Sequence, residues 1–259
     1  MQQQSNNPFF KNKEFNSAPQ TTYYNADGSP ANVIDYNDTM TVNGAMAKTA
    51  ILFGLLLAGA LVPFYLIAQG MNFYTPAIVS FVIALIIGLS VGFAPKQSRY
   101  LAPAYALFEG VVIGSISILF EVYVQPGIVL QAVGGTFVTF IVCLLLYRFR
   151  VVNVTERFKS VVIAATMALF IYYLVSMVVS WAFGITLFHH GNSLISIGFS
   201  IFVIVLAALN LFLDFDMIEE GAERRLPKYM EWFSAMGLMM TMIWLYLEFL
   251  KLLAKLNRD

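Results

Sequence analysis

The stretch Ile201-Phe-Val-Ile-Val-Leu-Ala-Ala-Leu-Asn-Leu-Phe-Leu-Asp214 decides the fold class, because its only polar residues are Asn210 and Asp214. It lies within an apolar run, residues 192–215, that is long enough for a helix to cross ~30 Å of hydrocarbon. An ionised side chain facing lipid near the bilayer centre costs several kcal/mol, so Asp214 is expected to face the protein interior. The run therefore predicts a transmembrane helix that carries a functional carboxylate.

The composition of the whole chain fits a polytopic membrane protein. Hydrophobic residues make up 59% of the chain and charged residues 12%, and the mean hydropathy is +0.74. A soluble domain carries roughly twice that share of charge. The net charge is zero, so the composition gives no electrostatic reason to expect a nucleic-acid partner. The single cysteine, Cys143, lies in an apolar run and is expected to be a small buried side chain.

Seven apolar runs, each about 20 residues long, follow a polar amino-terminal segment. They cover residues 47–69, 74–94, 101–122, 127–147, 160–183, 192–215 and 230–253. Because backbone groups in lipid must be satisfied internally, all seven are expected to be helices. We therefore predict an all-α protein, with a disordered cytoplasmic tail at residues 1–45 and a seven-helix transmembrane domain at residues 46–255.

Lysine and arginine predict the orientation of these spans. The connections after the second, fourth and sixth runs are basic, whereas those after the first, third and fifth contain no lysine or arginine. Basic connections favour the cytoplasm, so the amino terminus is expected there. Seven spans then place the carboxyl terminus outside, although Lys251, Lys255 and Arg258 favour the cytoplasmic side. The side of the carboxyl terminus therefore stays open.

The last two runs each contain a carboxylate, Asp214 and Glu248. Asp214 follows Asn210 by one helical turn, so both residues face the same side of the sixth run. Lys251 follows Glu248 by one turn, which leaves a local ion pair as an alternative role for Glu248. Two carboxylates that share a buried site repel one another, so that one proton can be lost near neutral pH. Oxygen ligands of this kind also suit Ca²⁺.

Two further carboxylates belong to the third run. Glu109 follows Tyr105 by one turn, a spacing that allows a hydrogen bond between them, whereas Glu121 ends the run and is expected to be an interface residue. The spacings of Gly88 with Gly92 and of Gly110 with Gly114 predict close approach of helix backbones, and Gly134-Gly135 in the fourth run is expected to do the same. Glycine at this spacing has no side chain to keep two helices apart.

Three strings in this order resemble motifs of a known family. Leu211-Phe-Leu-Asp-Phe-Asp-Met-Ile218 and Trp244-Leu-Tyr-Leu-Glu-Phe-Leu-Lys-Leu-Leu253 are similar to the closing motifs of the Bax inhibitor family, most closely of its bacterial branch. Ala132-Val-Gly-Gly-Thr-Phe-Val138 matches a further string of that family. The resemblance covers residues 45–255, which is the chain without its tail.

The resemblance implies a seven-helix bundle with the last helix central, wrapped by the other six. It also implies a calcium leak gated by protonation of a carboxylate pair, which by position is Asp214 and Glu248; both would then be Ca²⁺ ligands. The family usually has aspartate where Glu248 stands, and the link between the last two spans is long and charged in this sequence. Lys96 and Arg99 are the candidates for the family's basic latch, and Glu109, which is not a usual family feature, Asn210 and Asp216 are possible supporting residues.

Other function classes remain as alternatives to this pH-sensitive cation channel. The same carboxylates suit a proton-coupled transporter, and the bacterial relatives' association with a membrane protease keeps open a scaffold that binds other membrane proteins. Lys251 lies too near the end of its run for a retinal protein. His189 and His190 are adjacent in a loop and no hydrolase motif is present, so we expect neither an enzyme nor a cofactor. The expected partners are lipid, protons and Ca²⁺ as the permeant ion, in a bacterial plasma membrane.

Overall fold

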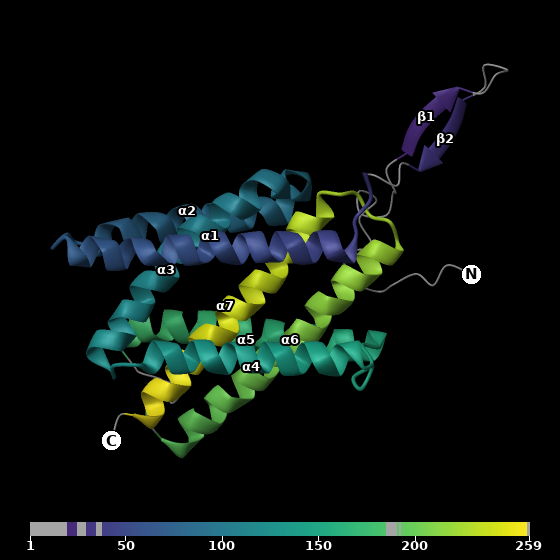
Figure 1. Cartoon of the computed structure of the whole chain (residues 1–259). Helices are drawn as coiled ribbons and strands as arrows, with labels where there is room; N and C mark the ends of the chain where they lie inside the picture. The colour runs from purple at the N-terminus through teal and green to yellow at the C-terminus, as the bar shows by residue number, and fades with distance from the viewer. Residues whose placement is uncertain (1–19, 25–29, 35–37, 185–190, 192, 258–259) are drawn as a thin grey trace. The chain divides into compact units, whose positions relative to one another are not determined.

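The computed structural model describes residues 20–24, 30–34, 38–184, 191 and 193–257 (Figure 1). Within these residues, seven helices are long and apolar enough to span a membrane. The long helices are α1 (Val42–Ala68), α2 (Tyr74–Phe93), α3 (Ser98–Tyr123), α4 (Ile128–Arg148), α5 (Glu156–Phe183), α6 (Leu194–Glu223) and α7 (Met230–Leu256), with a short 3₁₀ turn, η4 (Pro95–Gln97), before α3. This confirms the prediction of an all-α polytopic membrane protein.

Two helices begin earlier than their apolar runs because a threonine caps each of them. The side chain of Thr41 accepts a hydrogen bond from the Gly44 N–H at 2.9 Å, and that of Thr155 accepts one from the Phe158 N–H at 3.2 Å. Each cap satisfies a backbone donor that has no partner inside the helix. Helix α1 therefore begins at Val42 rather than at residue 47, and α5 begins four residues before the predicted start.

Helix α6 corrects the prediction of a long charged link between the last two spans. It continues through the acidic segment after Asp214 and ends at Glu223, so that only residues 224–229 separate it from α7. Glutamate is a good helix former, and Glu220 pairs with Arg224 one turn later. The charged residues that mark the end of the apolar run therefore extend the helix instead of ending it.

Part of the predicted tail is paired as two strands. Strand β1 (Gln20–Tyr24) lies antiparallel to β2 (Pro30–Ile34), with Thr22 opposite Asn32, and both are drawn as purple arrows in Figure 1. The strands contain threonine, tyrosine, valine and isoleucine, which favour extended backbone. The structure thus has a hairpin where we predicted disorder, and the remainder of residues 1–37 lies outside the described residues.

The chain divides into two compact units, each described here by itself. Unit 1 contains residues 1–114 and 214–239, and unit 2 contains residues 115–213 and 240–259. The boundaries fall within α3, α6 and α7, so these three helices contribute to both units. Helix α7 is the most buried of the seven described spans, with 61% of its most apolar stretch buried, as expected for a central helix.

In unit 1, glycines bring the backbones of α1 and α3 together. A Cβ atom on Gly110 would lie 2.2 Å from the Leu56 carbonyl oxygen, and one on Gly114 would lie 2.3 Å from that of Ala60. Because the neighbours are backbone atoms, no side-chain movement can relieve such a clash. The close packing predicted for Gly110 and Gly114 is confirmed, whereas Gly92 has nothing within 4 Å and does not show it.

Gly110→Ala should destabilise the protein by about 1–3 kcal/mol, because the added methyl group must push α1 away from α3. Thermal unfolding of the purified protein in detergent measures the effect. Gly134→Ala is a matched control, since Gly134 is also helical and has nothing within 4 Å. The control should be neutral or slightly stabilising. Equal melting temperatures for the two variants would contradict the backbone contact.

In unit 2, α5 and α6 form an apolar core. Val162 and Leu169 of α5 pack with Val203 and Leu206 of α6, and Trp244 of α7 lies against this cluster. These side chains are removed from lipid and from water, so they hold the three helices in one arrangement. The core positions the residues that surround Glu248.

Candidate ion and proton site

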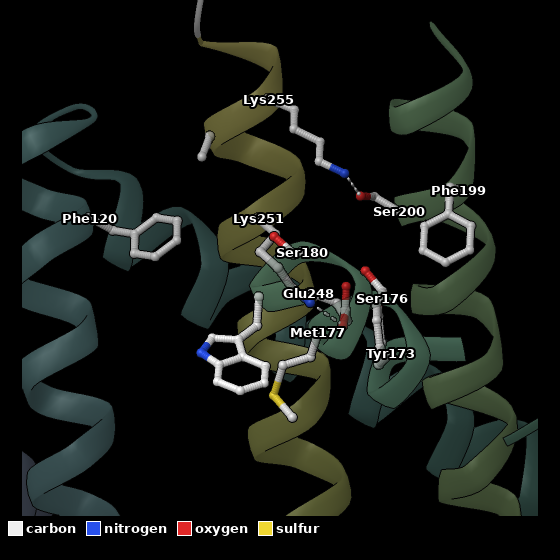
Figure 2. Close-up of a pocket in the computed structure, with 12 residues that line it drawn as sticks. Phe120, Tyr173, Ser176, Met177, Ser180, Phe199, Ser200, Glu248, Lys251 and Lys255 are labelled. Carbon is white, nitrogen blue, oxygen red and sulfur yellow. Dashed lines mark hydrogen bonds and ion pairs between the residues drawn. The ribbon is translucent and has the colours of Figure 1, made fainter. Parts of the chain in front are cut away.

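Glu248 of α7 is a buried carboxylate with three side-chain partners. Its side chain is only 2% exposed. The Lys251 Nζ donates to Oε1 at 2.5 Å, and the Trp244 Nε1 donates to the same oxygen at 3.2 Å. The Tyr173 hydroxyl of α5 also donates a hydrogen bond to Glu248. Figure 2 shows this carboxylate with Lys251 and Tyr173 beside it.

The ion pair with Lys251 is the local alternative that the sequence left open. The lysine follows Glu248 by three residues on the same helix, and its ammonium also lies 5.4 Å from the centre of the Tyr173 ring. Aromatic faces attract cations, so Tyr173 stabilises the ammonium as well as the carboxylate. A permeant cation that is to bind Glu248 would have to displace Lys251.

A pocket of about 650 Å³ opens beside this ion pair, and every residue that lines it belongs to unit 2. Lys255 of α7 also lines it, and its Nζ donates to the Ser200 Oγ at 2.7 Å (Figure 2). The same Nζ donates to the Ser196 carbonyl oxygen at 3.1 Å. The lining residues are Phe120, Tyr173, Ser176, Met177, Ser180, Trp181, Phe199, Ser200, Glu248, Lys251, Ala254 and Lys255.

Asp214 belongs to α6 within unit 1 and is half-buried. Its Oδ1 lies 3.7 Å from the position that a Cβ on Gly237 of α7 would occupy, so the carboxylate lies beside that helix. Glu248 lies in unit 2, and its pairing with Asp214 stays a prediction. Each of the last two spans nevertheless carries a carboxylate that is at least partly buried.

Comparison with known families identifies the family of the chain. The sequence model of a family described as Bax inhibitor 1 like matches residues 7–258, nearly the entire chain. The chain belongs to that family. No curated protein matches the chain in a sequence search. Membership of the Bax inhibitor 1 like family and the seven apolar helices together identify an integral membrane protein that sits in a lipid bilayer.

Two of the supporting residues in this family member make hydrogen bonds within their own unit. Glu109 is bonded to Tyr105, one turn earlier on α3, as the sequence predicted. The Asn210 Nδ2 donates to the Thr166 Oγ1 at 2.9 Å and to the Leu206 carbonyl oxygen at 2.8 Å. Asn210 therefore connects α6 with α5, which is a positioning role that the sequence did not indicate.

The remaining supporting residues lie in unit 1. Lys96 of η4 and Arg99 of α3 are exposed, and the Arg99 guanidinium lies 4.8 Å from the centre of the Tyr100 ring. Asp216 is half-buried on α6. The latch role of Lys96 or Arg99 stays a prediction, as does the supporting role of Asp216.

Glu121 has a structural role at the end of α3. Its carboxylate accepts hydrogen bonds from the backbone N–H groups of Gly127, at 2.5 Å, and Val129, at 3.2 Å. These bonds hold the turn between α3 and α4 and use donors at the start of α4 that lack helical partners. Among the residues that the structure describes, no group of three or more histidine, cysteine or acidic side chains is arranged to hold a metal ion.

The sequence analysis missed Glu231, a fully buried carboxylate in the first turn of α7. Its Oε1 accepts hydrogen bonds from the Thr41 N–H and the Thr41 hydroxyl, both at 3.0 Å. Lys48 of α1 lies 3.5 Å from Oε2, and Lys228 lies 3.9 Å from Oε1. An acidic residue in a first helical turn is a signal for favourable interaction with the helix dipole, but it does not indicate a partner 190 residues away.

The same region ties residues 38–41, which we call the amino-terminal strap, to the link between α6 and α7. The Met40 N–H donates to the Leu226 carbonyl oxygen at 2.7 Å, and the Lys228 N–H donates to the Asp38 carbonyl oxygen at 2.9 Å. Thr39 forms an isolated antiparallel bridge with Pro227. The strap and Glu231 thus fix the start of α1 to the start of α7 within unit 1.

Proposed function

We propose that this protein is a pH-sensitive leak channel for Ca²⁺, controlled by Asp214 and Glu248. Membership of the Bax inhibitor 1 like family supports a role in ion leak. The observation that carries the proposal is Glu248, a buried carboxylate within a span that lines a pocket and is paired with Lys251. Buried ionisable groups in spans commonly mark ion or proton paths.

The proposed mechanism is a competition for one carboxylate. Ionised Glu248 binds either the Lys251 ammonium or a cation, while Trp244 and Tyr173 hold the carboxylate in place through their hydrogen bonds. Protonation of Glu248 removes its attraction for the Lys251 ammonium and for the cation. Asp214 supplies the second charge that a divalent cation requires, and the two carboxylates titrate as a coupled pair.

The proposed orientation has the amino terminus in the cytoplasm of a bacterial cell, with the protein in the plasma membrane. The basic residues of the connections between α2 and α3, between α4 and α5, and between α6 and α7 support it. The strap and Glu231 then lie at the cytoplasmic ends of α1 and α7.

Lys251→Met should raise Ca²⁺ flux at neutral pH by about tenfold, because it removes the ammonium that competes for Glu248 through a charge-assisted hydrogen bond. Acidification should then lower the flux of this variant, since protonation of Glu248 now only removes the attraction for Ca²⁺. Flux into proteoliposomes loaded with a calcium dye, measured across a pH series, gives both results.

Lys251→Arg is the matched control, because it keeps a positive charge beside Glu248 and should retain low flux. If Lys251→Met conducted no better than the wild-type protein, the competition between Lys251 and Ca²⁺ would be excluded. The same assay separates the alternatives. A scaffold moves no cations without a partner, and a transporter gives saturable flux that is coupled to a gradient.

A further inference from the structure

The pocket beside Glu248 carries a surplus of positive charge. Its charged lining groups are one carboxylate, Glu248, and two ammonium groups, Lys251 and Lys255. The Glu248–Lys251 ion pair neutralises two of these charges, which leaves the charge of Lys255. An ammonium group without a counter-ion attracts negative charge, so a site of this kind favours an anionic occupant.

Lys255 is positioned to bind such an occupant. Two of the three N–H groups of its ammonium are used by the Ser200 hydroxyl and the Ser196 carbonyl oxygen, which fix the side chain against α6. The third N–H can donate a hydrogen bond to a bound anionic group. The Ser200 hydroxyl accepts from Lys255 and can donate its own hydrogen, and Ser180 adds a second hydroxyl to the lining.

Several polar residues of the pocket come from the ends of the unit 2 helices, and the ends of membrane-spanning helices are where lipid headgroups are expected. Lys255 is in the last turn of α7, Ser180 and Trp181 are in the last turn of α5, and Ser200 is in the second turn of α6. Trp181 is 88% exposed in the structure, and tryptophan gathers at the interface between membrane and water. The polar lining is therefore within reach of a headgroup.

The rim of the pocket distinguishes a lipid from a free anion. Trp181 and Met177, which is 63% exposed, line the pocket with apolar surface that has no cover within the described chain. A small hydrophilic anion gains nothing from this surface. A phospholipid brings acyl chains that cover it, so apolar contact and charge complementarity favour the same ligand.

We propose that this pocket binds the phosphate group of an anionic phospholipid, with Lys255 as its principal contact and with the acyl chains along Met177 and Trp181. Binding at this site requires neither Asp214 nor ion conduction. The proposal therefore goes beyond the function given above, and a measurement of lipid binding tests it without any measurement of flux.

The test is thermal unfolding of the purified full chain in a neutral detergent with added lipid. Phosphatidylglycerol should raise the melting temperature in proportion to its binding, whereas phosphatidylcholine with the same acyl chains and inorganic phosphate at the same concentration should not. Lys255→Gln should weaken the apparent affinity for phosphatidylglycerol by about tenfold or more, because a charge-assisted hydrogen bond is lost. Lys255→Arg should restore it.

Arg148→Gln is the matched control. Arg148 is an exposed cation at the last residue of α4, and the turn between α3 and α4 lies at the other end of that helix. It should bind phosphatidylglycerol like the wild-type protein. Equal stabilisation by phosphatidylcholine, equal stabilisation by inorganic phosphate, or an unchanged affinity in Lys255→Gln would each overturn the proposal. If Lys255→Gln does not fold, native mass spectrometry of the wild-type protein decides: retention of one phosphatidylglycerol in preference to phosphatidylcholine supports the site, and no preference overturns it.

Discussion

Glu231→Ala should destabilise the protein by about 2–4 kcal/mol, because hydrogen-bond donors of Thr41 lose a charged acceptor. The carboxylate is fully buried, and its removal leaves the backbone N–H and the hydroxyl of Thr41 without an acceptor. Lys48 loses its counter-ion at the same time. Glu231→Gln should cost less, because its amide oxygen can still accept from Thr41. Denaturant or thermal unfolding in detergent measures both effects.

Glu223→Ala serves as the control for the Glu231 variants. Glu223 is exposed at the end of α6, so its removal should change stability by less than about 0.5 kcal/mol. Combining Glu231→Ala with Thr41→Val should cost less than the sum of the two single changes, since the two side chains share a hydrogen bond. Additive effects, or a Glu231→Ala protein as stable as the control, would show that the strap does not depend on Glu231.

Asp214→Asn and Glu248→Gln should each alter Ca²⁺ flux in proteoliposomes and flatten its dependence on pH. Each change removes a titrating charge while keeping the size of the side chain. Glu248→Gln also weakens the attraction for Lys251. The Ca²⁺ flux of this variant therefore reflects the loss of two interactions of Glu248, one with Lys251 and one with Ca²⁺. A flux that keeps the pH profile of the wild-type protein in both variants would show that neither residue is the pH sensor.

Glu109→Gln is the control for these two variants. Glu109 is also an acidic residue within a span, but its carboxyl group is hydrogen-bonded to Tyr105 on the same helix. We expect it to support the structure of α3 rather than to control the ion path. The pH dependence of flux should therefore persist in Glu109→Gln.

The features that the sequence predicted well are local in the chain. The seven spans follow from stretches of apolar residues, and all seven are present within the described residues. The contacts between Tyr105 and Glu109 and between Glu248 and Lys251 join residues three or four positions apart on one helix. Helix geometry alone brings such residues together, so no knowledge of the fold is needed to expect them.

The features that the sequence did not predict depend on partners far along the chain. Glu231 looks like an ordinary first-turn glutamate, because its acceptor role becomes visible only when Thr41 is brought to it. The bonds of Lys255 to α6 join residues 55 and 59 positions apart. The extension of α6 was missed for a different reason: a charged segment ends an apolar run but does not end a helix whose residues favour helical backbone.

The most direct test of the central claim is a double-mutant cycle on Ca²⁺ flux, with the wild-type protein, Asp214→Asn, Glu248→Gln and the double variant compared across a pH series. Groups that titrate as one pair have non-additive effects. The proposed dyad therefore predicts that the double variant resembles one of the single variants, with little further change in flux or in its pH profile. Independent, additive effects of the two changes would contradict a shared site, even if each residue alone proved necessary for conduction.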